Sequence, residues 1–506
     1  MWLAGVAMLT GAFYVEEDWR GQRDWNRYRK AVESRGETLD FLSLVPKPVP
    51  DEENFVTTPI AQSLFQSKLP ILTNDLFARA DDHVFHTNNQ SFLGRRHFLD
   101  LVAWKMAWTA LKTGELNAGQ TFESDDMDPD ARRSAALAVL DGMKPDDKAF
   151  AELQKASARP YSRFPLTYDM DDPAQMSLSH LAYIKKICQR LDLMACAELA
   201  AGKPDLALSH VKLALYLTDS VKTEPVVISY LVRVLDFQLV IQAIWEGLAE
   251  HRWAESQLQD LQKCLQQYDF IADMDQPLKG ERTFGIREIK HYKKKGLGQL
   301  DDLYLLSIGD IDHLGQPTSH KTFLDLVGKI MPAGWYDLES LGYCVSLDAQ
   351  MRGVFDLSAK RVFPGTDASN RVELNKQLPD PSAPVSLKSI VHHRAMSPNP
   401  EFLSKLPIKA AASQTAANQA AIACALERYR LANGQFPETL DALTPKFMSQ
   451  VPNDVITGKP YKYHRTKDGQ FVLYSVGWNE TDDSGVNGKK MFDEKEGDWV
   501  WDYPVQ

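Results

Sequence analysis

The sequence AASQTAANQAAIACALERYRLAN, residues 411–433, predicts a long alanine-rich helix. Alanine has the highest helix propensity of the natural amino acids. The larger side chains Ile422, Leu426 and Tyr429 recur at intervals of four and three, which places them on one face of that helix. Asn433-Gly434 follows, and these residue types accept the left-handed backbone conformation found just after a helix. We therefore expect the helix to end there.

Two strand patterns follow this helix, after a short helical turn over residues 436–443. Residues 461–464 (YKYH) and 471–475 (FVLYS) are rich in aromatic and apolar side chains. They flank Lys467-Asp468-Gly469, and Asp-Gly is a strong signal for a tight β-hairpin turn. The sequence therefore predicts a small α+β module over residues 411–506, at the end of a chain that is otherwise mainly α.

The order of elements in this module is similar to the globular part of the major pseudopilins of type II secretion systems. The matching pieces are Asn433-Gly434-Gln435-Phe436-Pro437, Pro452-Asn453-Asp454, residues 458–463 (GKPYKY) and Tyr474-Ser475-Val476-Gly477. In pseudopilins a hydrophobic helix directly precedes this module, whereas here a long helical segment intervenes. The resemblance therefore implies the fold of the module, but not leader-peptide processing or pilus assembly.

The resemblance also implies a calcium site, because the acidic loop after the last strand of pseudopilins binds calcium. The counterpart here is NETDDSG, residues 479–485. Asp482, Asp483 and Asp454 would supply side-chain ligands, and calcium takes six to eight oxygens at about 2.3–2.6 Å. The alternative interpretation is a solvated acidic turn, because Asp, Asn, Ser and Gly are common turn residues without any ion.

Residues 95–360 carry a mostly helical pattern. The clearest apolar stripe, with a spacing of three or four, is Leu181, Ile184, Cys188, Leu191, Ala195 and Leu199. Residues 202–205 (GKPD) predict a helix end followed by a new helix start. Gly202, Ala207 and Ala214 fall where one tetratricopeptide-type hairpin needs small residues, but no second copy follows at a period of about 34 residues. Residues 245–265 predict another helix–break–helix, so we expect a body of packed helical hairpins.

The N-terminal segment WLAGVAMLTGAFYV, residues 2–15, is apolar and uncharged. As a helix it spans about 21 Å, which is short of the hydrocarbon core of about 30 Å. It also lacks the basic region and cleavage site of a signal peptide. We interpret it as part of a membrane anchor, with Trp19, Trp25 and Tyr28 at the membrane–water interface. The alternative is the buried N-terminal helix of a soluble domain.

A chain of 506 residues is too long for one compact core, so we expect two or more domains. Three prolines at positions 46, 48 and 50 predict an extended strap after a polar helix. Further prolines between positions 364 and 407 predict a linker. The expected organisation is an apolar segment (1–15), a stalk helix and strap (16–94), a helical body (95–360), a proline-rich linker (361–410) and the α+β module (411–506).

Charge and cysteine content argue against several classes of function. The net charge of −11 and the pI of about 5.6 disfavour nucleic-acid binding through a broad basic face. The basic run KHYKKK, residues 290–295, is either a local anion site or a solvated helix end. The five cysteines contain no CxxC pair, so they predict small buried thiols rather than a zinc site or a disulfide framework.

Strong enzyme signatures are absent from the sequence, which contains no GxSxG, HExxH or P-loop motif and no GxGxxG after a predicted strand. Three weaker patterns hold potential metal ligands: the DxDxD run at 126–130, the pair His83 and His86, and His392-His393. The DxDxD run lacks the glycine and glutamate of an EF-hand loop, and two histidines without a third ligand are a weak signal. Apart from calcium in the acidic loop, no cofactor is predicted, and the balance is against an enzyme.

The whole chain also resembles a family of large membrane-anchored proteins common in planctomycete and verrucomicrobial genomes. The residues that carry the resemblance are WRG (19–21), PDEENF (50–55), ALERYRL (425–431) and YSVGWN (474–479). We therefore hypothesise a membrane-anchored interaction or scaffold protein of the cell envelope, facing the periplasm and binding partner proteins. Two patterns bear on that orientation: the arginines after residues 2–15 favour a cytoplasmic flank, whereas the acidic run at 16–18 and the pseudopilin resemblance favour the opposite side. The alternatives are an envelope enzyme, such as a hydrolase with its site in the helical body, and a secretion or pilus subunit.

Overall fold

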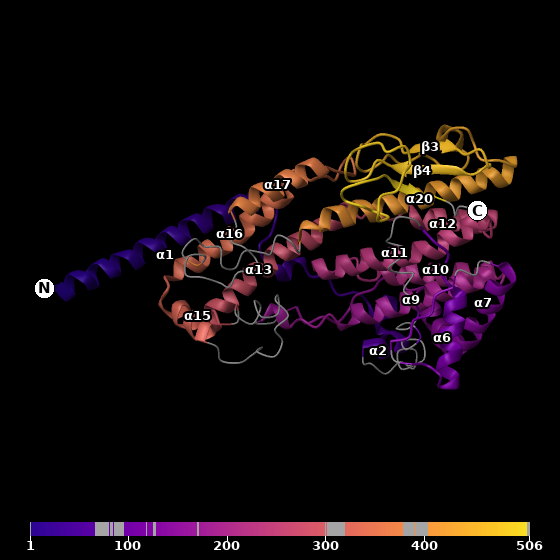
Figure 1. Ribbon diagram of the computed structural model, residues 1–506. Coiled ribbons are helices and arrows are strands. Elements are labelled where there is room, and N and C mark those ends of the chain that lie inside the picture. The colour runs from indigo at the N-terminus through magenta and orange to yellow at the C-terminus, as the bar shows by residue number, and fades with distance from the viewer. Residues whose placement is uncertain are drawn as a thin grey trace.

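The computed structural model describes residues 2–65, 80, 84, 96–117, 119–124, 128–168, 172–298, 300, 319–377, 390 and 403–502. Over these residues the protein is mostly helical, and its few strands form small sheets (Figure 1). The body is elongated, and helix α1 projects from one end of it. The mainly α class predicted from the sequence is thereby confirmed.

The helices are α1 (Trp2–Ser34), α2 (Pro59–Phe65), α6 (Leu101–Thr113), α7 (Pro129–Met143), α8 (Asp147–Ala156), α9 (Ser179–Ala200), α10 (Pro204–Asp219), α11 (Val227–Ala249), α12 (Glu255–Leu265), α13 (Asp275–Lys295), α15 (Ser319–Ile330), α16 (Ala333–Met351), α17 (Pro364–Gln377) and α20 (Leu406–Asn433). The strands are β1 (Phe355–Asp356), β2 (Arg361–Val362), β3 (Lys462–Arg465), β4 (Phe471–Ser475) and β5 (Trp499–Trp501). β1 pairs with β2, and β3, β4 and β5 form a sheet in that order.

The centre of the body contains the predicted helical hairpin and the predicted helix–break–helix. α9 and α10 pack together and are joined at Gly202, whose φ of +76° is a left-handed conformation that glycine adopts without strain. α11 and α12 follow each other with Trp253 between them, which packs against Gly247, and both helices pack against α20 rather than against each other. A Cβ atom on Gly247 would lie 2.1 Å from the indole Nε1, so only glycine permits this contact. Buried side chains of α9 and α11 dominate the main hydrophobic core.

The predicted C-terminal helix and hairpin are also confirmed. α20 begins at Leu406 rather than at residue 411, and Gly434 follows its end with a φ of +79°. β3 and β4 pair antiparallel, with Lys462 opposite Tyr474. β5 adds to the other edge of β4 and was not predicted, because three residues between loops are too short to show an alternating pattern.

The C-terminal module shares one core with the helical body. α20 packs against α11 and α12, and its buried alanines belong to the same hydrophobic cluster as α9 and α11. Gln238 of α11 donates from Nε2 to Ser413 Oγ at 3.1 Å, and Gln262 of α12 donates from Nε2 to the carbonyl of Phe447 at 2.9 Å. Packing is therefore continuous across residue 411, where the sequence suggested a domain boundary.

Of the two segments predicted to be irregular, the proline-rich strap is irregular in the structure, whereas the linker contains a helix. Residues 45–50 contain no helix or strand and lie across the body, where the carbonyl of Pro46 accepts a hydrogen bond from Arg163 Nε at 2.9 Å. The linker predicted over residues 361–410 instead contains α17, which starts at Pro364. Proline is well tolerated in the first turn of a helix, so this residue begins a helix rather than breaking one. Residues 378–389 and 391–402 of that linker lie outside the described residues.

Candidate functional site

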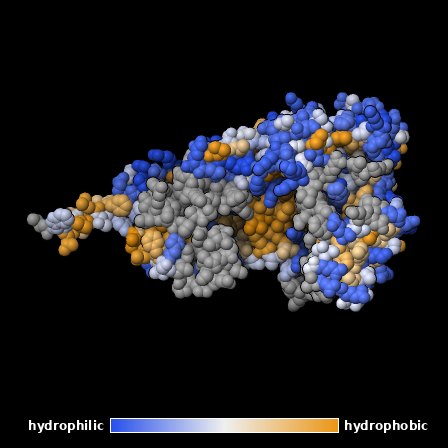
Figure 2. Space-filling view, viewed as in Figure 1, coloured by the Kyte–Doolittle hydropathy of each residue, from blue (hydrophilic) through white to orange (hydrophobic). Residues whose placement is uncertain are grey.

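The first half of α1 presents apolar side chains to solvent. Its exposed large apolar residues are Trp2, Leu3, Val6, Met8, Leu9, Phe13 and Val15. Trp2 is 88% exposed and Leu3 87% exposed. Figure 1 shows this part of the helix extending beyond the body, and Figure 2 shows apolar surface along it. An apolar surface of this kind usually marks contact with a membrane or a partner.

The second half of α1 is fixed to the body by a close crossing with α16. Gly21 is buried, and a Cβ atom built on it would lie 2.1 Å from the carbonyl oxygen of Gly334. A Cβ atom on Gly334 would in turn lie 2.4 Å from the carbonyl oxygen of Glu17. The two backbones can approach this closely only because both residues lack a side chain. The direction of the projecting segment is therefore set by a backbone contact.

The acidic residues that end the apolar segment bind the start of α16. Asp18 Oδ1 accepts a hydrogen bond from the backbone N–H of Gly334 at 2.7 Å. Glu17 Oε2 accepts one from the indole Nε1 of Trp335 at 2.8 Å. The backbone N–H of Gly334 lies in the first turn of α16, where a helix has unpaired donors and a partial positive charge. The acidic run, which at the sequence level bore only on membrane orientation, thus has a structural role.

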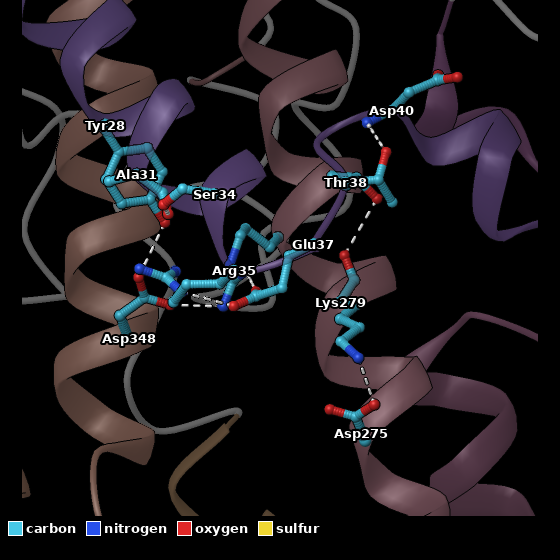
Figure 3. Close-up of polar contacts among 12 residues, drawn as sticks. Tyr28, Ala31, Ser34, Arg35, Glu37, Thr38, Asp40, Asp275, Lys279 and Asp348 are labelled. Carbon is cyan, nitrogen blue, oxygen red and sulfur yellow. Dashed lines mark hydrogen bonds and ion pairs between the residues drawn. The ribbon is translucent and has the colours of Figure 1, made fainter.

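A polar network holds the far end of α1 (Figure 3). Tyr28 donates its hydroxyl to Asp348 Oδ2 at 2.8 Å, and Arg282 of α13 binds both Asp348 at 2.6 Å and Glu37 at 2.5 Å. Arg35 adds a bond of 2.8 Å to Glu37. Burial opposes ionisation of Glu37, but the hydrogen bonds from Arg35 and Arg282 outweigh it and hold the pKa below its usual value. Tyr28, predicted at a membrane interface, therefore faces the body.

A second exposed apolar stripe lies beside the point where α1 leaves the body. Phe323, Leu326 and Ile330 recur along α15 at intervals of three and four, and all three are exposed. The hydroxyl of Tyr14 in α1 donates to the carbonyl of Ile330, so the two helices meet there. Figure 2 shows apolar surface at α15 on the same end of the molecule as α1. The opposite face of α15 is buried through Leu324 and Val327.

The basic run 290–295 ends α13 near the same place. Lys293 Nζ donates to the carbonyl of Ala333 at the start of α16, at 3.3 Å. Asp337 in α16 is close enough for Lys293 and Lys290 to act on it: burial raises the pKa of Asp337, and the two lysines partly oppose that rise. Acidic side chains at the same crossing, Asp18 and Asp337 among them, offset these lysines, so the run ends α13 in a region of mixed charge.

Among the described helices, α11 alone is long and apolar enough to meet a length-and-composition criterion for crossing a membrane. Its most apolar stretch is 72% buried inside the protein. That degree of burial is typical of a core helix in a folded body, where every face of the helix meets other protein.

The three predicted calcium ligands are each engaged by protein groups. Asp454 is buried, and its carboxylate accepts from Ser475 Oγ at 2.8 Å and from the backbone N–H of Ile456 at 3.0 Å. Asp482 pairs with Lys462 at 3.0 Å. Asp483 accepts from Asn479 Nδ2 at 3.3 Å.

The acidic loop is ordered by Asp498, which the sequence analysis missed. Asp498 accepts the backbone N–H groups of Asp483 at 3.2 Å and Gly485 at 2.6 Å. Its position directly before the apolar strand β5 was the signal that could have found it. Within the described ranges, no three His, Cys, Asp or Glu side chains gather in an arrangement that could hold a metal ion.

Of the residues in the DxDxD run, the two histidine pairs and the cysteines, the structure describes only some. Asp128 caps the N-terminus of α7, accepting the backbone N–H of Ala131 at 2.9 Å. Asp126, His83 and His86, and the pair His392-His393, lie outside the described residues. All five cysteines are free, and four are buried, as the sequence predicts.

An ionic cluster lies buried between α7, α9 and α11. Arg132 binds Glu246 at 2.5 Å, and the backbone N–H of Leu99 donates to the same carboxylate at 2.6 Å. Burial raises the pKa of both Glu246 and Asp192, and repulsion from Glu246 adds to the rise at Asp192. Burial also lowers the pKa of Arg96, beside Asp192, to about 10. The cluster is sealed from solvent and joins helices, which is a structural arrangement rather than an open catalytic one.

Asp236 is a second buried acid that the sequence analysis did not single out. It is fully buried in α11, and among the described residues neither of its carboxyl oxygens has a hydrogen-bond partner. Burial raises its pKa to about 8, although Lys185 partly opposes the shift. The sequence signal was a single acidic residue inside a mostly apolar helical stretch, VRVLDFQLVI.

Comparison of the chain with protein-family models, with curated proteins and with solved structures finds no match. Function must therefore be inferred from the surfaces and contacts described above.

Proposed function

We propose that this protein is a membrane-anchored scaffold of the cell envelope, held at a bilayer by residues 2–15 of α1. The observation that carries the proposal is the row of exposed apolar side chains on that segment, on a helix whose other half is fixed to the body. Burial of each large apolar side chain contributes about 2 kcal/mol. A rigidly projecting segment with several such side chains has a strong drive to leave water.

The surroundings of α1 support a membrane at this end of the molecule. The apolar stripe of α15 (Phe323, Leu326 and Ile330) would meet the boundary between headgroups and acyl chains, as amphipathic interfacial helices do. Lys290, Lys293 and Lys329 lie around the same end, where each basic residue near anionic lipid contributes about 1 kcal/mol. The body would then stand away from the bilayer along the direction of α1.

In the same proposal, partner proteins bind the C-terminal module, away from α1. α20 followed by the β3–β4 hairpin has the element order expected of a pseudopilin-like module. In this proposal the module faces the periplasm, and α13, α16 and α17 lie between it and the end from which α1 projects (Figure 1). A secretion or pilus subunit is less well supported, because α1 packs on α16 instead of continuing into α20.

Vesicle flotation of the full-length protein tests the membrane proposal. Leu3 and Leu9 together contribute about 4 kcal/mol to insertion, so the variant Leu3→Ser/Leu9→Ser should partition about 1000-fold less well. Leu137→Ser/Leu431→Ser is the matched control, because both leucines are about half exposed but lie on α7 and α20. We expect the wild type and the control to float with vesicles. The proposal fails if the wild type does not float, or if the control loses as much binding as the variant.

A further inference from the structure

A pocket of about 580 Å³ opens between α11, α20 and the loop before β5. This volume falls within the range of about 300–1,000 Å³ that is typical of small-molecule sites. The pocket belongs to the body and shares no lining residue with α1 or α15. Its ligand would therefore be distinct from the bilayer that α1 meets.

The floor of this pocket is apolar. It is formed by Val234 and Leu235 of α11, Ile408 and Ala412 of α20, and Phe492 of the loop. Leu235 is 37% exposed, although it lies on the helix that forms the centre of the core. A floor of this composition favours an acyl chain or another flexible apolar group over a polar metabolite.

The rim of the pocket is rich in lysine. The five lysines that line it are Lys405, Lys409, Lys489, Lys490 and Lys495. Lys405 pairs with Glu494 at 2.5 Å, and Lys489 pairs with Glu496 at 3.2 Å. Across the part of the chain that the structure describes, the other three make no ion pair, because the remaining acid, Asp493, accepts backbone N–H groups of the loop.

Lys409 is the most informative of the three. Its side chain is half-buried, and burial together with the nearby Lys405 lowers its pKa. A partly desolvated cation without a partner is costly, and an anion placed beside it would recover that free energy. The wall also includes Gln238, which is only 8% exposed. Its Oε1 has no hydrogen-bond partner among the described residues. The pocket therefore contains a donor, the Lys409 ammonium, and an acceptor, Gln238 Oε1, that have no partner among the described residues.

We propose that this pocket binds an anionic amphiphile, with a single apolar chain on the floor and a carboxylate or phosphate headgroup between Lys409 and Lys490. The apolar floor selects the chain, and the unpaired lysines select the charge. Long-chain carboxylates and monoacyl phosphates share this chemistry. The site does not depend on the membrane proposal, since none of its residues lies on the segment that would insert.

Calorimetric titration of the full-length protein, in a neutral detergent, tests this inference with three probes. Myristate and a monoacyl phosphate of equal chain length carry the charge, and the corresponding monoacylglycerol lacks it. We expect saturable binding of one or both anionic probes, at least 10-fold tighter than that of the neutral one. Only myristate binding would identify a carboxylate site, and only phosphate binding a phosphate site. Absence of saturable binding, or equal affinity for the neutral probe, would overturn the proposal.

Two variants locate the site. Lys409→Met/Lys490→Met should weaken binding of the anionic probe at least 10-fold and leave that of the neutral probe unchanged. Lys155→Met/Lys467→Met, on α8 and in the β3–β4 turn, is the matched control and should bind like the wild type. Unchanged anion binding by the first variant, with an unchanged melting temperature, would show that the ligand binds elsewhere and would contradict the assignment.

Discussion

Replacement of Asp236 by asparagine should make the protein more stable at neutral pH. The aspartate lies fully buried in α11 with no hydrogen-bond partner for either oxygen among the described residues. Burial raises its pKa in the folded protein to about 8, from an ordinary value of 3.8. The folded protein therefore keeps the carboxyl group protonated at pH 7, whereas the unfolded chain ionises it.

The sign and size of the effect follow from proton linkage. Because the folded pKa is raised, the folded state binds more protons than the unfolded state between about pH 4 and pH 8. Stability contributed by this group is therefore fully present below the unfolded pKa and falls as pH rises, by about 1.4 kcal/mol per pH unit. Between pH 4 and pH 7 the loss is on the order of 4 kcal/mol. Asparagine does not titrate, so the variant avoids this loss.

Urea unfolding at several pH values measures the difference. Relative to the wild type, Asp236→Asn should gain stability progressively from pH 5 to pH 7.5, and the difference should level off above pH 8. At pH 4 it should be no more stable than the wild type, because the amide is also buried without partners. Asp260→Asn, an exposed control on α12, should show no comparable trend. A difference that does not vary with pH would refute the assignment of a protonated carboxyl group.

Four further changes test other contacts. Gly334→Ala should destabilise the α1–α16 crossing by about 1–3 kcal/mol and expose α1 to protease. Gly5→Ala, where a Cβ atom would meet nothing within 4 Å, should have no such effect. Equal proteolysis of the two variants would contradict the crossing. Arg132→Met should cost about 3–5 kcal/mol, because it leaves Glu246 buried and unpaired, and addition of Glu246→Gln should recover part of that loss in the same unfolding assay. Asp498→Ala should remove two backbone hydrogen bonds from the acidic loop and speed its amide exchange at Asp483 and Gly485, while Asp468→Ala in the hairpin turn should not. Tyr28→Phe should lower the melting temperature by an amount equivalent to about 1 kcal/mol, through loss of the bond to Asp348; an unchanged temperature would argue against that network.

Local sequence signals predicted the helical elements well. The alanine-rich helix α20, the hairpin α9–α10, the break between α11 and α12, and the β3–β4 strand pair all carry periodicity or turn residues that act within a few positions. Gly202 and Gly434 mark helix ends because the backbone there needs a positive φ, and that requirement is visible in the residue type itself.

Long-range contacts were not predictable in the same way. The acidic run at 16–18 follows the apolar segment directly, and no local pattern indicates that Glu17 and Asp18 bind the start of α16, more than 300 positions away in the chain. Asp454 was grouped with Asp482 by analogy, yet each is held by donors from its own surroundings. The pairing of Arg132 with Glu246, and the gathering of lysines around one pocket, arise only when α7, α11 and α20 are brought together.

The most direct test of the membrane proposal is the environment of residue 9. A polarity-sensitive fluorophore attached to Leu9→Cys, in a Cys264→Ser background, reports whether this part of α1 enters a bilayer, and the same label on Leu137→Cys is the control. With anionic vesicles, the proposal predicts a blue shift and protection from an aqueous quencher at residue 9, with no change at residue 137. Equal exposure of both labels to the quencher, with vesicles present, would contradict membrane anchoring by α1.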